Sequence, residues 1–145
     1  MNKILAFLVF LFVVLLMACG SVDVLDEDVE TGNPDRPSAP SEYAGLSNPY
    51  VDAAAVESGR KIYQPNCSSC HGNHGKGDGA AAQSLDPAPT DLAAVQAILS
   101  DDYLLWRISE GGLMEPFRSS MPAWKTILTQ DQTWELIAFI RALEN

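Results

Sequence analysis

The sequence of 145 residues has little positive charge and few cysteines. Lysine and arginine number 9 against 19 aspartate and glutamate residues, so the formal net charge is −10. Nucleic acid is therefore excluded as an expected partner, because phosphate binding needs clustered cations. Only three cysteines are present, Cys19, Cys67 and Cys70, and each falls in a motif described below, which leaves no pair for a structural disulfide. The length is enough for one small domain with appendages.

The longest apolar run, at residues 4–18, has 15 residues, whereas a membrane-spanning helix needs about 20. It follows a single Lys3, and a basic start with a short apolar core is typical of a secretory signal. Residues 16–20, Leu-Met-Ala-Cys-Gly, resemble the bacterial lipobox. That resemblance implies cleavage before Cys19, a lipid on its sulfur and acylation of the new amino terminus, with palmitate for example. The alternative is an uncleaved anchor helix, and both place the rest of the chain on the periplasmic, extracytoplasmic side of a bacterial membrane.

Residues 19–51 are acidic and rich in proline. From residue 20 onward the stretch has seven acidic residues and four prolines, against the single Arg36. Such a composition buries too little apolar surface to fold alone. We therefore predict a lipidated tether that joins the membrane to a domain at residues 52–145. The alternative is that the tether becomes ordered along a larger partner, to which it offers apolar residues such as Tyr43 and Tyr50.

The most informative motif is Cys67-Ser68-Ser69-Cys70-His71. Two thiols three residues apart, followed at once by an imidazole, are typical of a c-type haem attachment site. The spacing lets both cysteines form thioether bonds with the vinyl groups of one porphyrin, and it holds His71 where a ring nitrogen can bind the iron. Zinc sites and redox dithiols also contain CxxC. The following histidine and the absence of a second cysteine pair favour one covalently bound haem c.

Two helices are predicted at the ends of the domain. Asp52 is a suitable N-cap for a helix from residue 53 to about residue 63. Gly59 is unusual there, because glycine in a helix interior costs about 1 kcal/mol relative to alanine. Thr129 and Gln132 form a capping-box pattern. The helix that they open has a broad apolar face, drawn from Trp134, Leu136, Ile137, Phe139, Ile140 and Leu143.

The order of these features resembles class I cytochrome c: a helix with an internal glycine, CxxCH, a variable middle, Met-Pro and a terminal helix. The resemblance covers residues 52–145. It implies an all-α fold around one covalent haem, in which the first and last helices cross at a glycine against an aromatic residue. The matching positions are Gly59, with Leu136 and Phe139 opposite.

Residues 72–79 contain four glycines, which indicates a tight loop with close backbone approach. A phosphate cradle is the alternative, but no strand precedes the loop and no Gly-Lys-Ser/Thr closes it. The stretch is similar to the CHGxxGxGDG pattern of small bacterial mono-haem cytochromes. His74 within it is expected to be an exposed loop residue.

Residues 86–92 are predicted to be extended and rigid, because proline fixes its own φ and restricts the residue before it. In class I cytochromes c, a proline carbonyl in this region accepts the second ring N–H of the axial histidine, which orients the ring. The resemblance implies this role for Pro87 or Pro89, and the sequence does not choose between them.

Ser100 is predicted to cap a helix over residues 101–110, which the Gly-Gly pair at 111–112 ends. Trp106 and Arg107 on this helix are chemically suited to hold a haem propionate. They are equally ordinary as core and surface residues.

Two methionines, Met114 and Met121, are candidates for the second axial ligand. A lone methionine is more often core filler than a ligand, but Met121 is followed by Pro122, and Met-Pro at this place resembles the distal loop of class I cytochromes. We therefore predict iron bound by His71 and Met121, with Met114 packing nearby. Trp124 in the same loop is a further candidate for the haem pocket.

An iron bound by one protein residue on each face of the haem predicts an electron carrier rather than an enzyme, because no coordination site is left open for a substrate. The carrier is expected to pass single electrons in a respiratory or photosynthetic chain. It would act as a subunit of a quinol-oxidising complex, and its sequence features look similar to the mono-haem subunit of alternative complex III. The alternative is a free lipid-anchored shuttle between complexes. A haem-based gas sensor and a purely structural lipoprotein are the alternatives from other classes.

Overall fold

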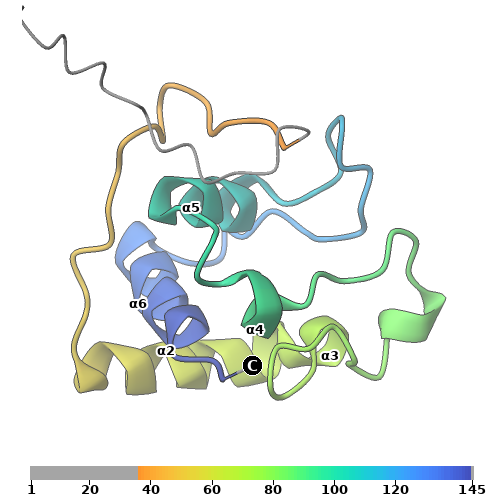
Figure 1. The fold of residues 1–145 in the computed structure, drawn as a ribbon, viewed down its shortest axis with the longest axis horizontal. Helices are drawn as coiled ribbons and strands as arrows, with labels where there is room; N and C mark the ends of the chain where they lie inside the picture. Colours follow the sequence, from red (N-terminus) through yellow and green to blue (C-terminus); the bar gives the residue numbers. More distant parts are fainter. Residues whose placement is uncertain (1–35, 145) are drawn as a thin grey trace, which may run out of the picture. The chain divides into compact units, whose positions relative to one another are not determined.

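The computed structural model describes residues 36–144, and in this range every regular element is helical (Figure 1). This confirms the predicted all-α fold class. The predicted signal segment, Cys19 and the first part of the tether lie outside the described residues. Within the described part of the chain, no helix is both long and apolar enough to cross a membrane. The elements are, in chain order, α2 (Ala53–Asn66), α3 (Ser68–His71), the 3-10 helix η1 (Ala82–Ser84), α4 (Leu92–Val95), α5 (Asp101–Glu110) and α6 (Gln130–Arg141).

Helix α2 begins where the sequence predicts. The Asp52 carboxylate accepts a hydrogen bond from the Ala55 amide at 2.8 Å and so satisfies one of the free N–H groups of the first turn. The helix continues to Asn66, past its expected end near Tyr63. Cys67 then joins α2 to α3, and its amide still donates to the Tyr63 carbonyl at 2.8 Å. The first cysteine of the motif is therefore fixed by the last turn of α2.

Helices α2 and α6 cross at Gly59. A Cβ atom at position 59 would overlap the Glu135 carbonyl group and would lie 2.9 Å from the Phe139 Cβ, so the close approach requires glycine. The opposing backbone belongs to Glu135 rather than Leu136, which is instead buried in the core. One turn further along α2, the Tyr63 ring lies 5.0 Å from the Phe139 ring.

Local features explain where α6 begins and where α5 ends. In α6 the Gln132 amide donates to Thr129 Oγ1 at 3.2 Å, and the Thr129 amide donates to Gln132 Oε1 at 2.9 Å, which confirms the capping box. The prediction for α5 needs a correction. Ser100 occupies the N-cap position, but its hydroxyl donates to the Asp102 carboxylate and caps no backbone amide. Gly111 ends α5 with a φ of 73°, as predicted.

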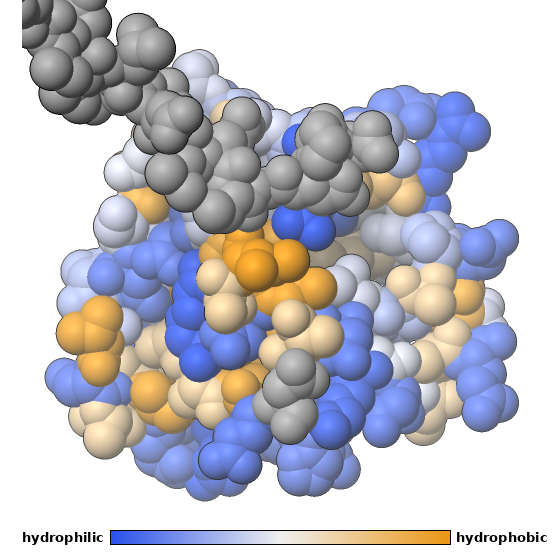
Figure 2. Space-filling view, viewed as in Figure 1, coloured by the Kyte–Doolittle hydropathy of each residue, from blue (hydrophilic) through white to orange (hydrophobic). Residues whose placement is uncertain are grey.

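The apolar core lies where α2, α5 and α6 meet, and it contains residues from all three. Leu143, beyond the end of α6, packs against its edge. On the face seen in Figure 2, apolar residues form patches among hydrophilic ones, in keeping with the acidic composition. The buried members of the core are Tyr63, Leu99, Leu104, Leu105, Ile108, Leu128, Trp134, Leu136, Ile137, Phe139 and Ile140.

Residues 36–50, called the strap below, lie against the helices (Figure 1). The Tyr43 hydroxyl donates to Glu110 Oε1 on α5 at 2.6 Å. Further along, Asn48 Nδ2 donates to the Trp134 carbonyl on α6 at 2.9 Å. The folded part of the chain therefore begins earlier than the sequence predicts.

Candidate functional site

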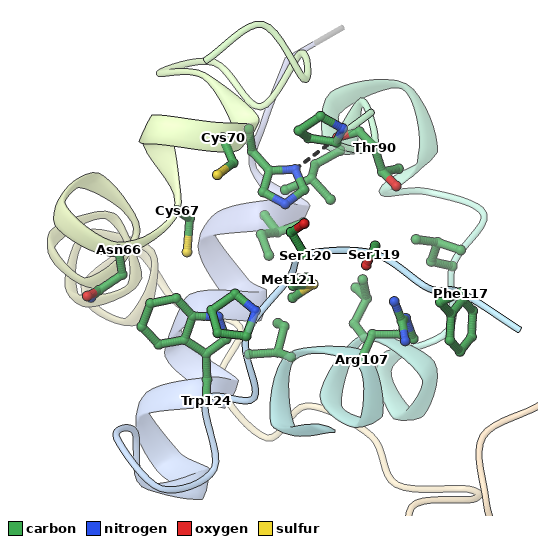
Figure 3. A pocket seen from close by; sticks show the side chains of 18 of the residues that line it. Asn66, Cys67, Cys70, Thr90, Arg107, Phe117, Ser119, Ser120, Met121 and Trp124 are labelled. Atoms are coloured by element: carbon green, nitrogen blue, oxygen red, sulfur yellow. Dashed lines mark hydrogen bonds between the residues drawn. The ribbon is translucent and has the colours of Figure 1, made fainter. Parts of the chain in front are cut away.

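A cavity of about 290 Å³ lies between the α2–α3 corner, helices α5 and α6, and the loops before α4 and α6 (Figure 3). Its wall is mainly apolar, with a few polar groups placed at separate points, as in sites that hold a cofactor. The apolar lining includes Tyr63, Leu85, Leu92, Leu99, Leu104, Ile108, Phe117, Leu136 and Ile140.

Both cysteines of the CxxCH motif line this cavity, and neither forms a disulfide. The amides of Cys70 and His71 donate to the Cys67 carbonyl at 3.2 and 2.9 Å, so the tight turn brings all three side chains to one wall. Burial raises the pKa of the Cys67 thiol to about 12. A raised pKa disfavours Cys67 as the attacking thiolate of a redox dithiol. Among the described residues, no group of three His, Cys, Asp or Glu side chains could complete a zinc site.

The His71 ring is oriented by one hydrogen bond. Its Nδ1 lies 2.9 Å from the Thr90 carbonyl oxygen, drawn as the dashed line in Figure 3. Nδ1 therefore carries the proton, and Nε2 is left with a lone pair for a ligand in the cavity. Burial lowers the pKa of His71, an effect that the Thr90 hydrogen bond opposes, and the neutral imidazole is the form that binds metal.

The carbonyl beside His71 corrects a sequence prediction. The acceptor is Thr90, not Pro87 or Pro89, although both prolines line the cavity. The Pro89 carbonyl is turned instead toward the glycine loop, where a Cβ at Gly77 would lie 2.5 Å from its oxygen. The proline segment still supplies the orienting group, through the residue that follows Pro89.

The glycine loop packs back onto the motif. The Gly77 amide donates to the His71 carbonyl at 2.9 Å, and the Gly79 amide donates to the Cys70 carbonyl at 3.1 Å. The buried Tyr63 hydroxyl donates to the Gly72 carbonyl at 2.7 Å. His74 is exposed, as predicted. The loop therefore holds the α3 turn in place and contributes no side chain to the cavity.

Of the two methionines, Met121 lines the cavity and Met114 does not (Figure 3). The main chain around Met121 is fixed on the end of α5. The Gly112 amide donates to the Met121 carbonyl at 2.9 Å, and the Trp124 amide donates to the Ile108 carbonyl at 3.1 Å. Met121 thus lies on a short segment that is held on both sides, which restricts where its side chain can lie.

The sequence predicts that Trp106, Arg107 and Trp124 lie in the haem pocket, and the structure places only two of them at the cavity. Arg107 and Trp124 line the cavity. Trp106 does not line the cavity, which corrects the prediction. It is buried, and its ring centroid lies 5.7 Å from that of Tyr103 and 5.5 Å from that of Phe117. Both of these aromatic residues line the cavity, so Trp106 lies behind the cavity wall and supports it.

Three groups that sequence reasoning missed also lie at the site. The Thr90 carbonyl has no side-chain signal, because every residue carries a carbonyl. Asn66 and Arg36 both line the cavity. Arg36 had one visible sign, since it is the only cation in a strongly acidic stretch.

A matched pair of glycine substitutions tests how Met121 is held. Gly111 has a φ of 73°, and a Cβ there would lie 2.6 Å from the Met121 carbonyl oxygen, whereas Gly45 has a φ of 75° and nothing within 4 Å of its added Cβ. Alanine at Gly45 incurs a positive-φ backbone cost of about 1–2 kcal/mol. Gly111 has a ψ of −153°, a conformation open essentially only to glycine, so its backbone cost is about 1–3 kcal/mol. We expect Gly111→Ala to lose about 1–3 kcal/mol more, measured by urea unfolding of the full chain. Equal losses would mean that Gly111 does not hold the Met121 main chain.

Comparison with known proteins gives a family match. The family described as "Cytochrome C oxidase, cbb3-type, subunit III" matches residues 54–140. The chain is 28% identical over 99 residues to the Cbb3-type cytochrome c oxidase subunit FixPc of Rhizobium leguminosarum bv. viciae. It is 29% identical over 101 residues to the subunit FixP of Rhizobium etli. Each alignment covers 68% of this chain and 31% of the relative, so the chain spans about a third of the length of these relatives.

Two solved structures share the fold. A chain of the Kuenenia stuttgartiensis reducing HAO-like protein complex has a TM-score of 0.56 at 24% identity, over 77% of this chain and 53% of that chain. Cytochrome CL from Methylophaga aminisulfidivorans has a TM-score of 0.53 at 23% identity, over 78% and 71%. The described helices therefore agree with the class I cytochrome c fold. Because the family match spans residues 54–140, the chain belongs to the cbb3-type cytochrome c oxidase subunit III family of cytochrome c domains, a domain type that implies haem c.

Proposed function

We propose that this chain holds one haem c in the cavity and carries single electrons at the extracytoplasmic face of a bacterial membrane. One observation carries the proposal: two free cysteines and an imidazole oriented through Thr90 lie on one wall of an apolar cavity. Cys67 and Cys70 are the residues that would anchor the group covalently. When bound, haem supplies one-electron redox chemistry at its iron.

The chain's own residues favour electron transfer over gas binding. His71 offers Nε2 from one side, and Met121 offers a thioether from a segment fixed on α5. If both residues bound the iron, no coordination site would remain for an external ligand. A thioether opposite a histidine also favours the reduced state and raises the reduction potential. The wall is mainly apolar, so charge at the site would be weakly solvated and the protein groups around it would influence the potential.

Arg107 is suited to hold a propionate of the bound group. It is half-buried, and burial lowers the pKa of its guanidinium. Its Nη1 donates to the Gly111 carbonyl at 2.6 Å, and its guanidinium carbon lies 3.4 Å from the Phe117 ring centroid. None of the ion pairs formed within residues 36–144 involves it. A cation held in this way is stabilised by a carboxylate from a ligand.

Covalent attachment is the first test. We expect the full chain, produced in cells that mature c-type cytochromes, to keep its haem after denaturation. The double variant Cys67→Ser, Cys70→Ser should lose all covalent haem, because no thioether bond can form. His74→Ala, an exposed histidine in the adjacent loop, is the control and should keep full haem content. Denatured protein without haem, or a double variant that retains it, would contradict the proposal.

The membrane and the partner subunits form a second part of the proposal. The lipobox-like residues 16–20 support a lipid on Cys19, and the relatives FixPc and FixP are named as subunits of cbb3-type oxidases. We infer that this chain is a mono-haem subunit of a membrane complex, with the quinol-oxidising alternative complex III as the finer assignment. Purification in mild detergent tests it. Copurification with integral and multihaem subunits supports a subunit, whereas a lone lipidated protein would indicate a free electron shuttle.

A further inference from the structure

The strap is attached firmly to the helices that build the cavity. Besides the Tyr43 and Asn48 side-chain bonds, the Gly45 amide donates to Asp102 Oδ2 and the Asn48 amide donates to Asp101 Oδ2, both at 2.9 Å. Asp101 and Asp102 lie in the first turn of α5. Asp101 is itself fixed by Arg141 of α6 at 2.6 Å. The strap is thus bonded to the start of α5, the end of α5 and the first half of α6, although the family match begins only at residue 54.

The first residue of the strap reaches the candidate site. Arg36 lines the cavity, and its guanidinium carbon lies 5.4 Å from the centroid of the Tyr103 ring. Tyr103 also lines the cavity and belongs to α5, one turn before Arg107. A cation–π contact of this kind favours arginine and positions its planar group. Two guanidinium groups from separate segments therefore meet the same cavity.

These two cations stand out against the charge of the chain. The sequence has 19 acidic residues against 9 basic ones. Even so, none of the ion pairs within residues 36–144 involves Arg36 or Arg107. The described residues that line the cavity include these two arginines and no carboxylate, so the lining carries a local positive charge in an acidic protein. Such a charge favours a ligand that carries anionic groups at its edge.

We propose that the strap is a working part of the cofactor site, and that Arg36 joins Arg107 in binding the carboxylate side groups of the occupant. The inference rests on the proposed function, which makes that occupant a haem with two propionates. A cation beside a redox group stabilises the reduced state, which carries one positive charge less, and therefore raises the reduction potential. The potential of the site then depends on a segment outside the matched cytochrome c domain.

The test is the midpoint potential of the full-length, haem-loaded protein, followed by optical redox titration. We expect Arg36→Gln to shift the potential downward, because the cation is removed, and Arg36→Lys to keep most of the original value. Arg118→Gln is the matched control: Arg118 is exposed, pairs with Glu115 and does not line the cavity. It should shift the potential clearly less than Arg36→Gln does.

A second variant tests the strap itself. In the double variant Tyr43→Phe, Asn48→Ala, the strap loses its side-chain hydrogen bonds to α5 and α6 while Arg36 is kept. We expect faster hydrogen exchange at the Gly45 amide together with a downward shift of the potential.

Several results would overturn the inference. They are an unmoved potential in Arg36→Gln, equal shifts in the glutamine and lysine variants, and a shift in Arg118→Gln as large as that in Arg36→Gln. A loosened strap with an unchanged potential would also overturn it. Haem absent from the denatured protein would instead contradict the proposed function, so the two failures are distinguishable.

Discussion

Gly59→Ala is expected to destabilise the protein by about 3 kcal/mol, the upper part of the range for overpacked sites. The added methyl group would overlap the Glu135 carbonyl and approach the Phe139 Cβ to 2.9 Å, so α2 and α6 would have to separate. This separation also loosens the core on both sides of the crossing. The free energy of unfolding from urea titrations, followed by far-ultraviolet circular dichroism, measures the effect.

The sign of the change in unfolding free energy distinguishes the steric effect from helix propensity. Helix propensity alone predicts that Gly59→Ala stabilises α2 by about 1 kcal/mol. Ala54→Gly, at an exposed position of the same helix, isolates the propensity contribution and should lose about that amount. If Gly59→Ala were more stable than the unchanged protein, the helix crossing would not require a glycine.

Met121→Ala is expected to abolish the weak far-red absorption band of the ferric protein, which arises from a methionine–iron bond. The reduction potential should fall, because the thioether that favours the reduced state is lost. The vacated position should also allow the ferrous protein to bind carbon monoxide. Absorption spectra and redox titration of the full chain measure all three effects.

Met114→Ala is the natural control for that experiment. Met114 lies outside the cavity, with its sulfur 3.9 Å from Arg107 Nη1, so its removal should leave the far-red band in place. Survival of the band in Met121→Ala would contradict the ligand assignment. Rapid carbon monoxide binding by the unchanged protein would favour a gas sensor over a carrier.

The parts of the fold that sequence reasoning predicted are those with local causes. Asp52 and the Thr129–Gln132 pair begin their helices through hydrogen bonds within one turn, and Gly111 ends α5 through its own backbone conformation. The helix crossing at Gly59 is not local, and it came from the resemblance to class I cytochromes c. Ser100 was misassigned because a hydroxyl can bond a neighbouring carboxylate as readily as an amide.

The unpredicted parts of the site depend on distant contacts. The Thr90 carbonyl faces His71, and the Pro89 carbonyl faces Gly77. No side chain in the sequence signals which of these carbonyls points to the imidazole. The docking of the strap rests on partners such as Trp134, which is 86 residues beyond Asn48. Composition alone made this stretch resemble a free tether, because its acceptors on α5 and α6 are invisible in the local sequence.

The separation of α2 and α6 along the chain has a consequence for the order of assembly. Leu136 and Ile140 of α6 form part of the cavity wall, and both α2 and the strap need α6 as a partner. Helix α6 follows the CxxCH motif with α5 in between, and contacts between segments that are distant in sequence form slowly. Cys67 and Cys70 therefore remain open on that side until α6 packs against α2. A group that binds covalently to both cysteines would have this interval in which to enter the site.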